Sequence, residues 1–214
     1  MARRSWLIKV ALGVVAVAGL AVLFVRSAQS TRAEPYDVRR ERLQRWTLAL
    51  EEPAAPSGVL LALRPQREFA STLFSDLFSR TGESITGPVP VQMPLVLRNE
   101  IDPRAAAELS ADGLVTLARE SGMESTIPQP KCMAHRRISA PGVTRQVYFV
   151  LFEMPAFGAF RQQLAPRVRE AGGTLDPAAL SPAVIIAASD ARFSDWQPLR
   201  GDAQQDCVAP ITVH

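Results

Sequence analysis

The feature that most constrains this chain is an apolar run from Trp6 to Val25, twenty residues in which Lys9 is the only charged side chain. A helix rises about 1.5 Å per residue, so a run of this length reaches about 30 Å, the thickness of the hydrocarbon core of a bilayer. Backbone polar groups left unpaired in lipid are costly, which favours a helix throughout the run. The sequence therefore predicts one transmembrane helix over residues 6–25, after a short N-terminal tail of residues 1–5.

Basic residues flank the predicted span on both sides. Arg3 and Arg4 precede it, Lys9 lies one turn inside it, where its stem can reach back to the headgroups, and Arg26 follows it. The apolar run is longer than that of a usual signal peptide, and the small-x-small site that ends at Ala33 lies well beyond it. We therefore expect a retained signal anchor, with cleavage as a signal peptide as the alternative.

Two features of the sequence give opposite indications of how the chain is oriented in the membrane. More arginines follow the span than precede it, which by the positive-inside rule would place the C-terminal part in the cytoplasm. A short tail before a long domain, in contrast, commonly leads to translocation of the domain. We expect residues 6–25 to have the lipid bilayer as their partner and the domain to lie outside the cytoplasm, in the periplasm or the extracellular space.

Charge is divided unevenly along the chain. Residues 1–45 contain nine of the 24 Lys and Arg and three of the 21 Asp and Glu, a net charge of +6, and the remainder, with 15 and 18, has a net charge of −3. A mildly acidic domain lacks the basic surface that binds phosphate backbones, which excludes nucleic acid as a partner. We assign residues 26–45 to a basic juxtamembrane tether and residues 46–214 to one soluble domain, a length that suits a single core.

The soluble part predicts a mixture of helices and strands. Residues 67–80 and residues 155–171 each place their large apolar side chains on one helical stripe. The runs 131–139 and 143–152 flank the turn Ala140-Pro141-Gly142 and predict a β-hairpin. Shorter apolar runs predict further strands over residues 59–63, 89–97, 184–188 and 207–213.

Prolines and charges modify two of these predictions. Pro90 and Pro94 lack the N–H that a central strand needs, so residues 89–97 are expected at the edge of a sheet. Residues 36–50 predict a charged helix that turns into a strand near Trp46. The order of the elements favours a single compact α+β domain with one antiparallel or mixed sheet and helices on one face, of which a ferredoxin-like core is one form.

The chain has two cysteines and two histidines, which lie in two clusters. Cys132 and Cys207 fall on two predicted strands, so outside the cytoplasm they most simply form a disulfide. One alternative is a zinc or copper site made of Cys132, Met133, His135, Cys207 and His214, although residues three or seven apart on a strand point to opposite faces. The other alternative is a pair of unbonded, buried cysteines.

The sequence contains none of the common enzyme signatures: no nucleophile elbow, no HExxH helix, no glycine-rich phosphate loop and no CxxC pair. An isolated histidine before two arginines, as at His135, is typical of a solvated strand residue. We therefore expect no cofactor, favour a protein without catalytic activity, and predict a binding or scaffolding module for another envelope protein. The alternatives are an anchored redox or metal-handling protein that uses the cysteine, histidine and methionine clusters, and a hydrolase whose site is defined only by geometry.

Overall fold

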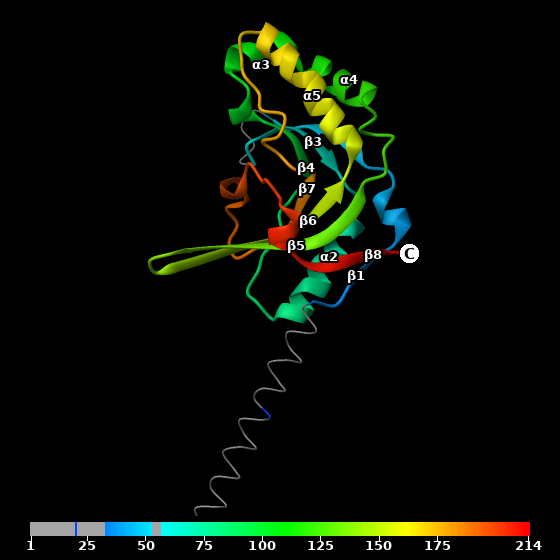
Figure 1. The fold of residues 1–214 in the computed structure, drawn as a ribbon, viewed down its shortest axis with the longest axis vertical. Helices are drawn as coiled ribbons and strands as arrows, with labels where there is room; N and C mark the ends of the chain where they lie inside the picture. The colour runs from blue at the N-terminus through cyan, green and yellow to red at the C-terminus, as the bar shows by residue number, and fades with distance from the viewer. Residues whose placement is uncertain (1–19, 21–32, 53–56) are drawn as a thin grey trace, which may run out of the picture. The chain divides into compact units, whose positions relative to one another are not determined.

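The computed structural model describes residue 20, residues 33–52 and residues 57–214. The chain divides into two units, Met1–Glu34 and Pro35–His214, and the fold below is that of the second unit. Figure 1 shows this unit as an α+β domain whose helices and strands pack around a common core. The compact α+β class predicted from the sequence is confirmed.

The predicted membrane span and the tail before it lie outside the described residues, apart from Leu20. In the part of the chain that is described, no helix is both long and apolar enough to cross a membrane. Residues 35–45, which the sequence assigns to the tether, belong to the folded unit, because Tyr36, Val38 and Leu43 are buried. The domain therefore begins about one strand earlier than predicted.

The domain contains two sheets. The larger has the strand order β1-β8-β5-β6-β7, in which β1 and β8 are parallel and every other neighbouring pair is antiparallel. Its strands are β1 (Tyr36–Val38), β5 (Gln129–Ala140), β6 (Val143–Glu153), β7 (Ala183–Ala188) and β8 (Cys207–Val213). The smaller sheet is antiparallel, in the order β2-β3-β4, and is made of β2 (Thr47–Leu50), β3 (Val59–Arg64) and β4 (Met93–Leu97).

The prediction of a single sheet is wrong, because the strands form two sheets. The ferredoxin-like arrangement is therefore wrong as well, since it needs both halves of a β-α-β-β-α-β unit in one sheet. Strand β4 lies close to β7 (Figure 1), yet no ladder joins them. One polar group of β4 is used outside a ladder: the carbonyl of Leu95 accepts a hydrogen bond from Arg161 at 3.0 Å in place of a strand. The prediction of an edge strand here is confirmed.

The first stretch of the domain also differs from the prediction of a charged helix over residues 36–50. Strand β1 is followed by a short 3-10 helix, η1 (Arg40–Leu43), and then by β2. The apolar residues of this stretch are spaced too irregularly for one helical stripe, and tertiary contacts determine their conformation. Trp46 packs edge-on against Phe152, with ring centroids 5.3 Å apart.

Strand β6 separates the two parts of the core. Successive side chains of a strand point to opposite faces. Those of Tyr148, Val150 and Phe152 enter the larger core, whereas those of Val147, Phe149 and Leu151 enter the smaller one. The long helices α2 (Arg67–Thr81) and α5 (Pro155–Glu170) contribute to the larger core, and the 3-10 helix η3 (Phe193–Trp196) and α6 (Ala203–Asp206) close the smaller one.

The helices predicted over residues 67–80 and 155–171 and the predicted hairpin are confirmed. Single residues determine where several elements end. Helix α2 ends at Gly82, which has the left-handed conformation (φ 61°) that glycine adopts at little cost. Helices α3 (Pro103–Leu109) and α4 (Ala111–Glu120) meet at Ser110, whose hydroxyl accepts a hydrogen bond from the N–H of Gly113 at 3.1 Å. The hairpin turns at Gly142 with a φ of 77°.

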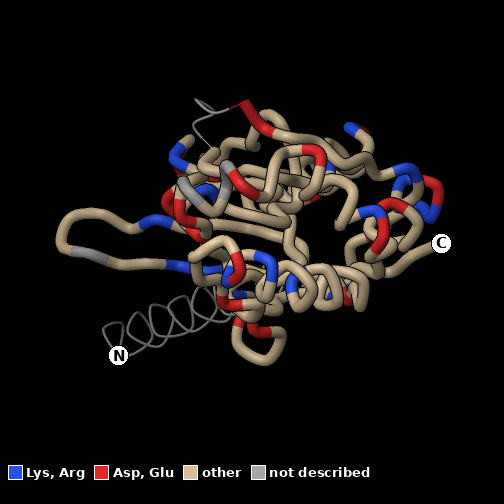
Figure 2. Tube along the Cα trace, turned by 90° about the horizontal axis from the view of Figure 1, so that it is seen from above, with Lys and Arg blue, Asp and Glu red and all other residues tan. Residues whose placement is uncertain are grey.

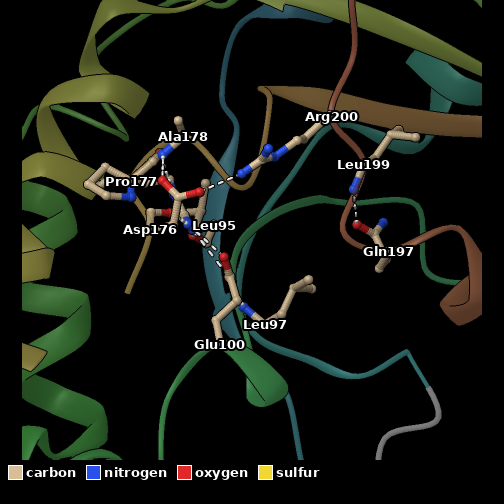
Figure 3. A network of polar contacts seen from close by, with 10 residues as sticks. Leu95, Leu97, Glu100, Asp176, Pro177, Ala178, Gln197, Leu199 and Arg200 are labelled. Atoms are coloured by element: carbon tan, nitrogen blue, oxygen red, sulfur yellow. Dashed lines mark hydrogen bonds and ion pairs between the residues drawn. The ribbon is translucent and has the colours of Figure 1, made fainter. Parts of the chain in front are cut away.

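The buried side chain of Arg161 holds several elements together. Its partners Leu95, Glu100, Asp176 and Pro177 are labelled in Figure 3. Its Nη1 and Nη2 donate to Glu100 at 3.2 and 2.6 Å. Its other hydrogen bonds go to backbone carbonyls, those of Leu95 and Pro177 at 3.0 Å each and that of Asp176 at 2.7 Å. Every one of the five donors of a guanidinium therefore has an acceptor, which is the condition for burying such a charge.

Replacement of Glu100 by Gln leaves the buried guanidinium of Arg161 without its counter-charge. We expect a loss of about 3 kcal/mol in the free energy of unfolding, measured by urea denaturation of the full chain. The matched control is Glu170→Gln, an exposed carboxylate on the same helix as Arg161, which should change stability by no more than about 0.5 kcal/mol. Equal effects of the two substitutions would show that the buried pair does not stabilise the domain.

Candidate functional site

The hairpin formed by β5 and β6 extends beyond the sheet. Strand β8 pairs only with Cys132–Ala134 of β5, and β7 pairs only with Val147–Leu151 of β6. Within the described chain, residues 136–145 therefore have no third strand beside them, and we call them the arm. Figures 1 and 2 both show the arm projecting from the body of the domain.

The two faces of the arm differ in polarity. Ile138 and Val143 lie on one face, and their side chains are 51% and 54% exposed. The opposite face carries Arg137, Ser139 and Thr144, which are also exposed. The tip has no charged residue, and the basic residues lie nearer the body (Figure 2). Apolar side chains held in solvent on a projecting strand pair are typical of a protein contact surface.

The β5 side of the arm is fastened to the body through Arg136. Its guanidinium forms an ion pair with Asp206 at 2.6 Å and donates to the carbonyl of Arg200, also at 2.6 Å. The carboxylate of Asp206 additionally accepts the N–H of Asp202 at 2.8 Å, so the short helix α6 is held in the same network.

The β6 side is fastened through Arg145. Its guanidinium pairs with Asp190 at 2.7 Å and with Asp195 at 3.0 Å, and it lies over the ring of Trp196, 5.3 Å from the centroid. The hydrogen bond from Arg145 is the main reason why the pKa of Asp190 falls to about 2, and the same pair raises the pKa of Arg145. Trp196 is buried and closes the smaller core.

A disulfide joins the two strands next to the arm. Cys132 and Cys207 are bonded, with their Cα atoms 5.7 Å apart, which confirms the predicted pairing. The bond links β5 to β8 and closes a loop of 75 residues. In the chain-entropy model a loop of this length contributes about 4 kcal/mol to stability.

His135 belongs to a polar cluster at the start of the arm. Its ring stacks on that of Tyr148, with centroids 4.4 Å apart, and its Nε2 lies 3.2 Å from Oε1 of Gln146. The Tyr148 hydroxyl and the Gln146 amide both donate to Oε2 of Glu83, at 2.7 and 2.6 Å. The histidine is thus half-buried and held by neighbours, unlike the solvated residue that the sequence predicts. The cluster connects β5 and β6 to the loop after α2.

The five candidate metal ligands do not meet at one site. The two thiols are used in the disulfide, Met133 lies in the larger core, and His135 is in the polar cluster. His214 follows β8, and its Nε2 lies 2.9 Å from Oδ1 of Asp37. Among the residues that the structure describes, no group of three His, Cys, Asp or Glu is placed to hold a metal ion. The four basic residues assigned to the anchor flanks, Arg3, Arg4, Lys9 and Arg26, lie outside the described residues.

Two hollows lie on either side of the segment Pro88–Pro90, which forms a wall between them. The larger, of about 610 Å³, runs between this wall and α2, and Ile186 of β7 lines it. The smaller, of about 500 Å³, lies between the wall and the loop that contains Phe193. The sequence predicts residues 89–97 as an edge strand but does not predict the hollows. They depend on how this segment packs against α2 and β7, which no local pattern reveals.

Comparisons of the chain with protein-family models, with curated proteins and with solved structures give no match.

The ion pair between Arg145 and Asp190 predicts a specific acid sensitivity. The pKa of Asp190 is about 2 in the folded domain, below the value of about 3.9 of an unfolded chain, so its stabilising contribution is complete above pH 4 and is lost as the pH falls toward 2. Between pH 5 and pH 2.5 the free energy of unfolding of wild type should fall by on the order of 1 kcal/mol more than that of Asp190→Asn. The difference is no larger because the pair is partly solvated. Urea denaturation at the two pH values measures this difference.

The control for this prediction is Glu120→Gln, which removes an exposed carboxylate of α4. Its pH dependence should follow that of wild type. If the stability of Asp190→Asn has the same pH dependence as that of wild type over this interval, the pair between Arg145 and Asp190 is not the source of the acid sensitivity.

Proposed function

We propose that the protein is a noncatalytic binding module, anchored by one transmembrane helix over residues 6–25, whose folded domain lies outside the cytoplasm and binds another envelope protein through the arm. The length and composition of the apolar run support the anchor. The bond between Cys132 and Cys207 supports the location, because structural disulfides persist in oxidising compartments and are rare in the cytosol.

The observation that carries the proposal is the exposed apolar face of a rigidly held arm. Ile138 and Val143 are more than half exposed on a strand pair that extends past its neighbours. Ion pairs of Arg136 and Arg145 and the nearby disulfide fix the base of the arm in the unbound domain. A surface that is already ordered loses little conformational entropy on binding, which favours affinity.

The chemistry of the arm indicates the kind of surface that it fits. Residues 136–145 include three arginines and no Asp or Glu, and of the arginines Arg137 is the exposed one. The complementary surface is an apolar patch for Ile138 and Val143, and acidic side chains of the partner pair with Arg137 only where the partner also reaches the opposite face. The outer edges of the arm also have unpaired backbone groups within the described chain, so a strand of the partner can add to them.

Site-specific photocrosslinking in cells that produce the full chain tests this function. A photoreactive phenylalanine analogue is placed at Ile138 or Val143, on the apolar face, and, as matched controls, at Ser139 or Thr144, on the opposite face. We expect one discrete adduct of a second envelope protein from the apolar-face positions and at least about fivefold less from the controls. An adduct of twice the chain mass would identify a second copy of the chain as the partner.

Charge insertion on the same face gives an independent check. Ile138→Asp combined with Val143→Asp should abolish the adduct formed from a probe at Pro141 while changing stability by no more than about 0.5 kcal/mol, since both side chains are exposed. Equal crosslinking from both faces of the arm, or from neither, contradicts the proposal.

A further inference from the structure

The larger hollow is a groove with one helical wall. Arg67, Ala70, Ser71 and Phe74 line it, and their spacing of three and four residues places them on one stripe of α2. The segment Pro88–Pro90 forms the opposite wall. The groove is open to solvent along its length, and its volume of about 610 Å³ lies within the range of roughly 300–1,000 Å³ that small-molecule sites occupy.

Charge is confined to one end of this groove. Arg64 and Arg67 line the end where α2 begins, whereas Phe74 lies two turns further along, about 10 Å away at the rise of a helix. Among the described residues that line the groove there is no Asp or Glu. Arg64 pairs with Glu51 at 2.5 Å, which leaves Arg67, exposed at the positive end of the helix dipole, as the main source of charge.

The rest of the groove is apolar, and some of its apolar side chains are exposed to solvent. Val89 is 96% exposed on the wall, and Ile186, which is buried, also lines the groove. Phe74 stacks on Phe78, with ring centroids 6.5 Å apart, and Phe78 is 51% exposed next to it. A ligand that covers these side chains would remove apolar surface from water, which is favourable.

The backbone of the two walls distinguishes between possible ligands. From Ala70 onward the N–H groups of α2 are used inside the helix, and Pro88 and Pro90 have no N–H. A peptide laid in the groove would therefore bury its own polar backbone against walls that offer few partners, which is costly. An acyl chain has no polar groups to satisfy and does not incur this cost.

We infer that this groove binds an amphiphilic anion, with a single acyl chain along α2 and its carboxylate or phosphate on Arg67. A guanidinium recognises either head group by charge-assisted hydrogen bonds. The inference is independent of the arm, which lies on another part of the domain and contributes no residue to the groove.

Photolabelling tests the inference with the full chain in phosphatidylcholine nanodiscs. The probe is dodecanoic acid with a diazirine near the end of its chain, and the labelled peptides are identified by mass spectrometry. We expect adducts on residues 70–74 and 87–91. Unlabelled dodecanoate or dodecyl phosphate should compete, and the better competitor identifies the head group. Dodecanol, which has the same chain and no charge, should compete about tenfold less well.

Variants separate recognition of the head group from that of the chain. Arg67→Gln should weaken labelling about tenfold and Arg67→Lys less, because lysine keeps the charge. Ser71→Trp places a ring in the groove and should abolish labelling. The matched control, Arg169→Gln, removes an exposed arginine of α5 and should leave labelling unchanged. Equal competition by dodecanol, wild-type labelling of Arg67→Gln, or adducts mapped outside the groove overturns the inference.

Discussion

A buried guanidinium needs acceptors for all of its donors, and this requirement at Arg161 determines how the interior of the domain is assembled. Its acceptors come from β4, from Glu100 and from the loop of Asp176 and Pro177, so α5 is held at one distance from each of them. Asp176 also pairs with Arg200, whose carbonyl accepts from Arg136 at the base of the arm. One series of polar contacts thus extends from the buried charge to the projecting hairpin, and Figure 3 shows its inner part.

The sequence predicts the elements that depend on local pattern. Helix α2, the hairpin, the edge position of β4 and the pairing of the two cysteines follow from periodicity, turn residues and strand placement. The elements that depend on distant contacts are not predicted. Arg161 lies on the apolar stripe of α5, four residues after Phe157 and three before Leu164, but the acceptors that allow its charge to be buried are 15 to 66 residues away in the chain. The parallel pairing of β1 with β8 joins opposite ends of the domain, which no local pattern reveals.

The arm and the groove are similar in one respect: each combines exposed apolar side chains with arginine and has no carboxylate of its own. In the arm the apolar residues are two β-strand positions on one face, a geometry that suits another polypeptide. In the groove they line a helix and a proline segment, a geometry that suits a ligand without backbone. The mildly acidic net charge of the domain does not reveal either site, because it sums the charges of all residues, wherever they lie on the surface.

We propose that this domain, which a disulfide holds together, lies outside the cytoplasm. The most direct measurement is the mass of the full chain after cells are quenched with an alkylating reagent and the protein is unfolded, with and without reductant. The account predicts no alkylated cysteine without reductant and two with it, since Cys132 and Cys207 are bonded and are the only cysteines in the chain. Alkylation of both on unfolding alone would show reduced thiols and contradict the claim.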